Sequence, residues 1–360
     1  MKKLILFSII VLTSLQLLAQ KKLRQPVDTI GFATKAWQLD SIVKRIDRSY
    51  GPSIDSVNKM NLLDENSVFR LAICPHDDYT YAGFLYETII PHIKAKTVLI
   101  FGVAHKAKKF NVEQKLVFDS FDEWKEPFGN IKSSTLREGI IKHLPKEVYI
   151  IHDSLQQAEH SVEALVPFLQ YYNPGVQIVP ILIPAMNFNM MEKYSLELAE
   201  AINKVMNENH LRWGEDIALL VSNDAVHYGD EDWGGTNYAT YGCDTAGYEK
   251  ALNHENEIIS TSLLPTPDTA SIHKFFNYTV KPGNWHDYQW PWCGRYSVPF
   301  GLLTGMYLGQ IRGEEKLKGI KMGYSSSIAH RPLPVDDLKM GKTAIANLHH
   351  RFGYAAIGYK

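Results

Sequence analysis

The chain has 360 residues, of which 45% are hydrophobic and 21% are charged, so it can bury a large core. Its 38 Lys and Arg side chains nearly balance its 39 Asp and Glu side chains, and they form no basic stripe, which argues against nucleic acid as a partner. No low-complexity linker divides the chain, and we therefore expect one main domain.

Residues 1–19 have the pattern of a secretory signal peptide. Lys2 and Lys3 precede a short apolar run, and Ala19 lies at a suitable cleavage point. A retained membrane anchor needs about 20 apolar residues, whereas polar residues interrupt this run early. We expect a soluble protein that is exported to the periplasm or secreted, with no membrane span after the signal peptide is removed.

The only cysteines are Cys74, Cys243 and Cys293, an odd number for an exported protein. At least one of them lies outside any intramolecular disulfide. Cys74 lies in an apolar run, as is typical of a buried free thiol. The sequence leaves open whether Cys74 and Cys243 are bridged.

In chain order, residues 20–65 are polar and irregular, and we predict an N-terminal arm with one helix around Trp37–Arg48. Residues 66–360 alternate short β-rich runs with helical patterns, which indicates an α/β domain. The predicted strands are Phe69–Cys74, Val98–Gly102, Val148–His152, Gln177–Ile183, Ile217–Ser222 and Gly319–Ser325. The predicted helices are Tyr79–Lys94, Ser134–His143, Glu159–Tyr172, Met190–Asn207 and Gly301–Ile311.

Several of these strands are apolar throughout, as in VLIF and IALLV. This pattern predicts a central twisted sheet, mostly parallel or mixed, with helices on both faces. The turn-rich segment Gly323–Ala344 is expected to cover an edge.

His76 and His105 each follow a predicted strand, in PHDDYTYAG and GVAHK. Because ligands gather at the carboxyl ends of parallel strands, both histidines are expected on one rim of the sheet. Cys293 lies far downstream, in NWHDYQWPWCGR. If the fold brings the three together, two imidazoles and a thiolate suit iron, copper or zinc and leave coordination positions open.

Asp224 and His227 follow another strand, in SNDAVHYGD, on the same rim. Their spacing predicts that both side chains lie on one side of a helical turn. Asp224 can orient an imidazole, bind metal itself, or bond its own backbone in a turn, and the sequence does not decide among these roles.

Asp77 and Asp78 stand between a strand and a helix, where carboxylates favour the free backbone amides of the helix start. In AEHSVEALVPFL, the predicted helix would carry His160, Glu163 and Pro167 along one side. His160 is either an ordinary helix residue or an acid/base group in the pocket.

The segment Trp285–Trp292 gathers tryptophans, Tyr288 and His286 before Cys293. It is either the wall of a pocket for a planar ligand, to which Tyr79 and Tyr81 can add, or a loop held by the core.

Five motifs together resemble the Memo family, also called AmmeMemoRadiSam system protein B, which is similar to the LigB-type class III extradiol dioxygenases. The family's PHAGYxYSG resembles PHDDYTYAG here, GPSHH resembles GVAHK, and EHSIExHLPY resembles EHSVEALVPF. SSDFxHWG resembles SNDAVHYG, and a CGR element before an apolar helix resembles CGRYSVPFGLL. The five occur in the family's order, from residue 75 to about residue 305.

The resemblance implies a LigB/Memo-like fold, with His76, His105 and Cys293 as metal ligands. Asp224 and His227 would line the pocket, with His160 near it. It also implies iron or copper and redox chemistry, and a small-molecule, aromatic or peptide partner. The dioxygenases use two histidines and a carboxylate, so Cys293 departs from their pattern and puts ring cleavage in doubt.

The chain also departs from Memo itself, because Asp77-Asp78 replaces Ala-Gly and Lys106 replaces the second histidine of GPSHH. Our leading hypothesis is a mononuclear iron or copper redox enzyme in which His227, Asp224 and His160 are the catalytic residues. The alternatives are a zinc-dependent hydrolase that uses Asp77 or Asp78 as a base, and a ligand- or peptide-binding protein without catalysis.

Overall fold

The computed structural model describes residues 21–341 and 345–360. The predicted signal peptide therefore lies outside the described residues. The strands are β1 (Leu23–Arg24), β2 (Leu71–Cys74), β3 (Thr97–Val103), β4 (Leu116–Phe118), β5 (Glu123–Glu126), β6 (Gly129–Ser133), β7 (Tyr149–Ile151), β8 (Gln177–Ile183), β9 (Ile217–Ser222), β10 (His227–Gly229), β11 (Gly319–Ser326) and β12 (His350–Tyr359).

The helices are α1 (Ala36–Met60), α2 (Tyr79–Ile89), α3 (Leu136–His143), α4 (Asp153–Ala158), α5 (Val166–Tyr172), α6 (Phe188–Glu208), α7 (Thr245–Ile258), α8 (Thr269–Thr279) and α9 (Ser297–Arg312). Short 3₁₀ turns lie at Ile90–His92, Ala107–Phe110 and Asp336–Leu338, and a π-helical turn at Ile259–Leu263 follows α7.

The sheet is mixed, and its main path has the order β1-β5-β6-β8-β3-β9-β2-β12-β10. The adjacent strands β8, β3, β9 and β2 are parallel to one another, whereas β12 is antiparallel to β2, β10 and β11. Three parallel strands, β3, β9 and β2, therefore stand side by side and end at the same edge. The α/β fold class and the mixed sheet predicted from the sequence are confirmed.

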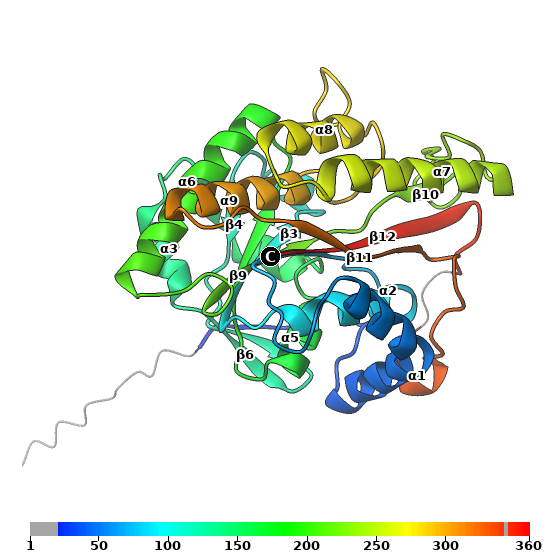
Figure 1. Ribbon diagram of the computed structural model, residues 1–360, viewed down its shortest axis with the longest axis horizontal. Helices are drawn as coiled ribbons and strands as arrows, with labels where there is room; N and C mark the ends of the chain where they lie inside the picture. The colour runs from blue at the N-terminus through cyan, green and yellow to red at the C-terminus, as the bar shows by residue number, and fades with distance from the viewer. Residues whose placement is uncertain (1–20, 342–344) are drawn as a thin grey trace, which may run out of the picture.

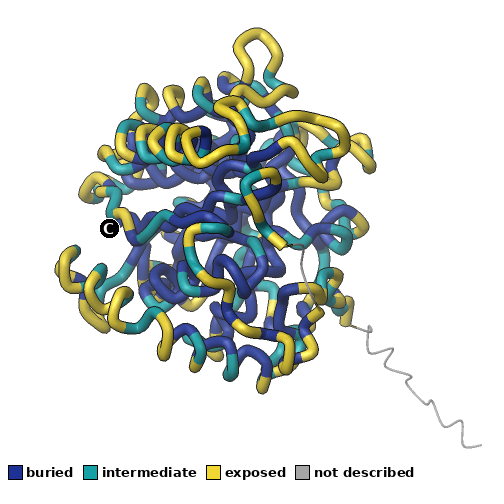
Figure 2. The backbone as a smooth tube through the Cα atoms, turned by 90° about the vertical axis from the view of Figure 1, so that its right-hand side faces the viewer, coloured by how far each residue is buried: buried dark blue, intermediate teal, exposed yellow. Residues whose placement is uncertain are grey.

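Both faces of the sheet are covered by helices (Figure 1). In the view of Figure 1, α6, α7, α8 and α9 lie above the sheet, and α1, α2 and α5 lie below it. Leu71, Ile73 and Leu219 face the upper core, whereas Ala72, Cys74 and Leu220 face the lower one. Because alternate residues of a strand point to opposite faces, a strand between two cores is apolar throughout. Figure 2 shows the buried backbone concentrated in the middle of the molecule.

Three predicted elements need correction. The helix expected at Trp37–Arg48 extends to Met60: its fully buried residues lie in its first half, and Tyr50, Ile54 and Val57 beyond them are only partly buried against the core. Residues Glu159–Tyr172 are not one helix: α4 ends at Ala158, and α5 begins at Val166. The segment expected to cover an edge begins inside β11, and after β11 it packs on the α1 side, where Arg45 pairs with Asp337.

The N-terminal segment is joined to the sheet through β1, which pairs with β5 in parallel. Arg24 is only 1% exposed, and its guanidinium forms an ion pair with Glu163 (2.6 Å) and lies 4.1 Å from the ring centre of Trp124. All three cysteines are free, so Cys74 and Cys243 are not bridged. No helix in the described ranges is both long and apolar enough to cross a membrane.

Candidate metal centre

The ends of the three adjacent parallel strands place the first site residues. His76 follows β2, His105 follows β3, and Asp224 follows β9, all at the carboxyl edge. Cys293 arrives from the other direction, in the turn before α9. The separate elements therefore bring together the residues that the sequence analysis expected on one rim.

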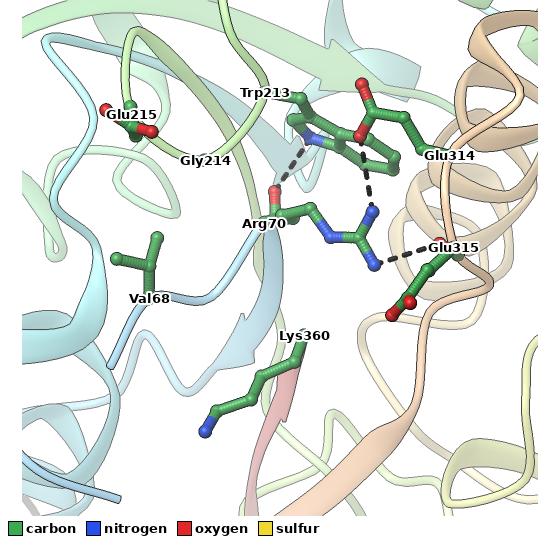
Figure 3. Close-up of a pocket in the computed structure, with 8 residues that line it drawn as sticks. All are labelled: Val68, Arg70, Trp213, Gly214, Glu215, Glu314, Glu315 and Lys360. Carbon is green, nitrogen blue, oxygen red and sulfur yellow. Dashed lines mark hydrogen bonds and ion pairs between the residues drawn. The ribbon is translucent and has the colours of Figure 1, made fainter. Parts of the chain in front are cut away.

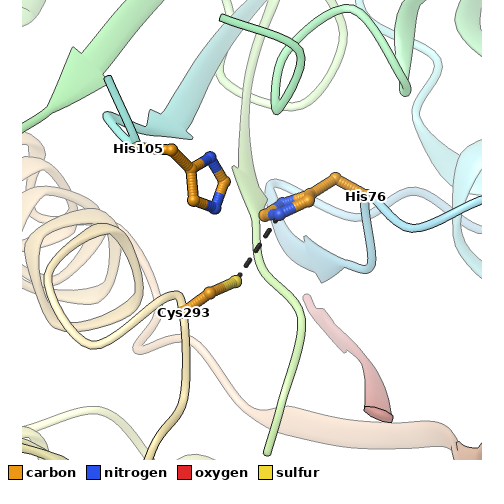
Figure 4. Close-up of side chains that lie close together, drawn as sticks. All are labelled: His76, His105 and Cys293. Atoms are coloured by element: carbon orange, nitrogen blue, oxygen red, sulfur yellow. Dashed lines mark hydrogen bonds between the residues drawn. The ribbon is translucent and has the colours of Figure 1, made fainter. Parts of the chain in front are cut away.

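The side chains of His76, His105 and Cys293 converge (Figure 4). One ligand atom from each of the three lies within 4.8 Å of those of the other two. Cys293 Sγ is 3.5 Å from His76 Nε2, and the rings of His76 and His105 have centres 5.3 Å apart. Two imidazoles and a thiol at these separations form a donor set that fits iron, copper or zinc.

His76 is held on both sides. Its Nδ1 lies 2.7 Å from Ser222 Oγ, which itself donates to the carbonyl of Ser161, and its backbone N–H donates to Asp224 Oδ1 (2.9 Å). Nε2 is thus the ring atom that faces Cys293. Burial, together with the charges of His105 and His160, lowers the pKa of His76 well below its ordinary value. A neutral imidazole is the form that binds a metal.

His105 is held by Glu159, whose Oε1 lies 2.8 Å from Nδ1. The carboxylate of Glu159 is buried, and it also accepts hydrogen bonds from the backbone N–H groups of His160 and Ser161. These bonds turn the chain at the point where the sequence predicted a continuous helix. Burial alone raises the pKa of Glu159, but the charge and hydrogen bond of His105 outweigh it and lower the pKa to about 2.

His160 lies beside the other two imidazoles. Its ring stacks on that of His105, with centres 5.0 Å apart and an interplanar angle of 14°, and it meets the His76 ring edge-on at 5.7 Å. The expectation that His160, Glu163 and Pro167 share one side of a helix is wrong, because His160 lies in the turn between α4 and α5. Pro167 instead stands in the first turn of α5, a position that suits proline.

Asp224 and His227 also approach Cys293, but not through a helical turn. Residues 223–225 have no regular secondary structure, and His227 begins β10, so the predicted helical spacing is wrong. Even so, Asp224, His227 and Cys293 offer ligand atoms within 4.8 Å of one another. The backbone N–H of Asp224 donates to Cys293 Sγ (3.1 Å). Asp224 therefore contacts two of the three candidate ligands, His76 and Cys293.

His227 has a ring nitrogen to spare. Its Nε2 is buried and has no hydrogen-bond partner among the described residues. Burial and the charge of His105 lower its pKa to about 3, and burial raises the pKa of Asp224 to about 7. An imidazole kept neutral with a free nitrogen can accept or pass on a proton.

The aromatic segment is held by the core, and part of it also lines a cavity, so the two alternatives from the sequence do not exclude each other. Trp290 and Trp292 are buried, and both indoles donate to Glu255, which fixes the segment to the core. Tyr288 lines a cavity of about 660 Å³ together with His105, Cys293 and Arg295. Tyr79, in contrast, is entirely buried and donates to the carbonyl of Ala164.

Gly294 allows this segment to come close to the strand ends. A Cβ added at Gly294 would lie 1.9 Å from Asn223 Oδ1. Any larger residue after Cys293 would therefore push the thiol away from the histidines or displace Asn223, which is fully buried. The glycine of the CGR motif is thus required because there is no space for a side chain at this position.

Asp78 caps α2, accepting a hydrogen bond from the backbone N–H of Tyr81, as the sequence predicted for the pair. Asp77 instead accepts hydrogen bonds from the Tyr354 hydroxyl (2.5 Å) and the Asp78 backbone N–H. Burial, followed by the charge of Asp224, raises the pKa of Asp77.

Two cavities adjoin the cluster. The 660 Å³ cavity lies on the side of His105 and Cys293, and a second, of about 420 Å³, is lined by His160, Asp77 and Asp78. Another cavity, of about 560 Å³, lies where β2 and β9 begin, at the opposite ends of the strands (Figure 3). In this cavity the Arg70 guanidinium already pairs with Glu314 and with the carbonyl of Glu315. The described residues that line the cavity therefore include no group of metal-binding side chains like that of His76, His105 and Cys293.

The residues that hold His76 and His105 in place were not predicted from the sequence. Glu159 was only the first residue of a predicted helix, Ser222 was only the last residue of a predicted strand, and Arg24 belonged to an arm without assigned chemistry. The adjacency of Glu159 and His160 in EHS was the one available signal, since carboxylates commonly orient metal-binding imidazoles.

Comparison with known proteins agrees with these motifs. Residues 44–329 match the family model described as Memo-like protein. A MEMO1 family protein of Caldivirga maquilingensis is 28% identical over 195 residues, which cover 52% of this chain and 64% of the relative. Relatives with the same family name in Pyrobaculum aerophilum and Saccharolobus islandicus are 30% and 31% identical over 44% and 43% of this chain, and 54% and 52% of their own lengths.

The matched region thus spans between about half and two thirds of these relatives. The family model covers most of the chain, including His76, His105, Asp224, His227 and Cys293. The chain therefore belongs to the Memo-like protein family.

Proposed function

We propose that this Memo-like protein is a redox enzyme that holds one iron or copper ion through His76, His105 and Cys293. The convergence of the three ligand atoms within 4.8 Å of one another is the observation that carries the proposal. Ser222 and Glu159 engage Nδ1 of the two histidines and so leave Nε2 of each for a metal. Such partners raise ligand basicity and fix ring orientation.

The bound ion would supply redox chemistry and polarise a substrate. The chain's own residues would do the rest. Asp224 positions His76 and the Cys293 thiol through the contacts described above, and His227, with its free Nε2, would accept or deliver a proton near Cys293. His160, on the wall of the 420 Å³ cavity, is the second candidate for acid/base work.

For the substrate we propose a small molecule that enters the 660 Å³ cavity beside Cys293. That volume lies within the range of small-ligand sites, roughly 300–1,000 Å³. The wall formed by Tyr288 and Tyr296 suits a planar or aromatic compound. We also propose, on the pattern of residues 1–19, that the protein is exported.

Zinc hydrolysis is the rival activity. Asp77 and Asp78, the bases it would use, are already engaged by Tyr354 and by the start of α2, which favours the redox proposal.

The test is elemental analysis of the protein purified without chelator, beside His76→Ala and Cys293→Ser. We expect about one iron or copper per chain, lost in both variants while circular dichroism shows a folded protein. His143→Ala, which removes a surface imidazole paired with Glu208, is the control and should keep the metal. Stoichiometric iron or copper in both site variants would overturn the proposal, and zinc with oxygen-independent turnover would favour the hydrolase.

A further inference from the structure

A second group of metal-binding side chains lies outside the site described above. Asp230 follows β10, Cys243 precedes α7, and His349 precedes β12. One ligand atom from each lies within 4.8 Å of those of the other two. Three residues of three different donor types thus converge from three separate loops.

One oxygen, Oδ1 of Asp230, lies close to the ligand atoms of both other residues. Asp230 Oδ1 lies 3.2 Å from Cys243 Sγ and 2.8 Å from His349 Nδ1. Glu231 Oε1 is 3.9 Å from the same His349 nitrogen and offers a fourth donor. Donor atoms around a tetrahedral ion lie about 3–4 Å apart, given metal–ligand bonds of about 2.0–2.3 Å.

Backbone hydrogen bonds fix the position of Asp230 and Glu231 relative to His349. The N–H groups of Asp230 and Glu231 both donate to the carbonyl of His349, at 3.0 and 3.2 Å. Gly229 permits this approach, because a Cβ there would lie 1.8 Å from the same carbonyl oxygen. The aspartate and the histidine are therefore fixed relative to one another before any ion arrives, which lowers the cost of binding.

We propose that Asp230, Cys243 and His349 form a second metal site, for a zinc-like divalent cation. A thiolate, an imidazole and a carboxylate are the three ligand types that Zn²⁺ uses, and the fourth position falls to Glu231 or water. On binding, the ion replaces the thiol proton and any imidazolium proton, which are released to solvent. The thiolate and carboxylate together match its two positive charges.

The site would hold a loop in place beside the first centre. The chain between Asp230 and Cys243 carries Trp233, whose ring stacks on His350 at 4.4 Å and on His227 at 5.4 Å. An ion that joins both ends of this loop to His349 would keep Trp233 against His227. The second site is therefore structural, and it does not depend on the redox proposal.

The experiment uses the full chain stripped of metal and titrated with Co²⁺, followed by optical absorption, and with Zn²⁺ against a chromophoric chelator. In a Cys293→Ser background, which removes the thiolate of the first centre, we expect one equivalent of Co²⁺ to give a thiolate charge-transfer band. The band should vanish when Cys243→Ser is added. His349→Ala should weaken Zn²⁺ binding at least about tenfold.

His143→Ala is again the control and should leave Zn²⁺ binding unchanged. Absence of a thiolate band in Cys293→Ser, or its persistence in the double variant, would overturn the second site. Loss of the first metal in Cys293→Ser does not bear on this result, so the two proposals fail separately.

Discussion

His105 Nδ1 lies 2.8 Å from Oε1 of Glu159, and the carboxylate side of this contact is buried. The carboxylate also ties down the turn after α4 through the N–H groups of His160 and Ser161. A single side chain therefore orients one candidate ligand and shapes the loop that carries the neighbouring histidine.

Glu159→Gln should weaken metal binding by roughly 10–100-fold, the usual loss when the partner of a ligating histidine is changed. The glutamine keeps an acceptor oxygen but loses the charge that stabilises the ring's N–H. Competition with a chromophoric chelator measures the affinity. Glu208→Gln, which alters the exposed pair with His143 (3.0 Å), is the matched control. Equal affinities for both variants would contradict a role of Glu159 at the centre.

Arg24→Met should destabilise the fold by roughly 3–5 kcal/mol, because it leaves the buried carboxylate of Glu163 without its cation. It should also lower metal affinity, since Arg24 donates to the backbone carbonyls of Gln156 and Glu159. Urea unfolding and the chelator assay measure the two effects.

The double variant Arg24→Met/Glu163→Gln separates these effects. Removal of the unpaired charge of Glu163 should restore part of the stability. It should not restore the metal affinity, because the hydrogen bonds from Arg24 to the carbonyls of Gln156 and Glu159 remain lost. Full recovery of both would show that the effect of Arg24 on the centre is electrostatic only.

Gly294→Ala should abolish or strongly weaken metal binding and cost roughly 1–3 kcal/mol of stability, typical of overpacking. The added carbon overlaps Asn223 and displaces Cys293. Gly51→Ala in α1 is the control, because a Cβ there meets nothing within 4 Å and alanine is favoured in helices. Metal titration and thermal unfolding of both variants provide the comparison. Unchanged metal binding and stability in Gly294→Ala would refute the steric argument.

Glu87, which lies away from the candidate metal centre, should make the stability of the fold depend on pH. Burial raises its pKa from 4.5 to about 8, although Tyr172 donates to it. The folded state thus keeps a proton that the unfolded chain loses, and the stability that this proton contributes is lost as the pH rises from about 4.5 to about 8. Each unit between the two pKa values corresponds to roughly 1.4 kcal/mol.

Glu87→Gln removes this titration. Its stability relative to the unaltered protein should therefore increase between pH 5 and pH 8, as measured by urea unfolding at both values. A stability difference that is the same at both pH values would show that Glu87 ionises normally in the folded state.

The sequence was sufficient to predict the parallel strands and the shared rim at which the candidate ligands His76 and His105 lie. β2, β3 and β9 are apolar throughout because both of their faces are buried, and His76 and His105 follow strand ends that must share an edge. Cys293 was a candidate ligand from its residue type, but only the motif resemblance placed it beside the histidines, because no local pattern shows where the turn before α9 packs.

Other features depend on contacts between distant residues. The hydrogen bonds of Glu159 override the helical spacing of residues 159–172, and β1 is strand only through its pairing with β5. β12, with its small residues and glycines, was not predicted. Its Gly358 leaves room for Phe69, since a Cβ there would lie 2.2 Å from that ring.

The position of β12 in the sheet also determines how late in synthesis the sheet can be completed. It lies between β2 and β10, although it comes almost 280 residues after β2 in the chain. Throughout synthesis from the N-terminus, β2 therefore has one unpaired edge beside His76, and such edges invite pairing with other chains. His76 and His105 are synthesised long before Cys293 and β12, so the proposed three-ligand metal centre would form only late, when the sheet is nearly complete.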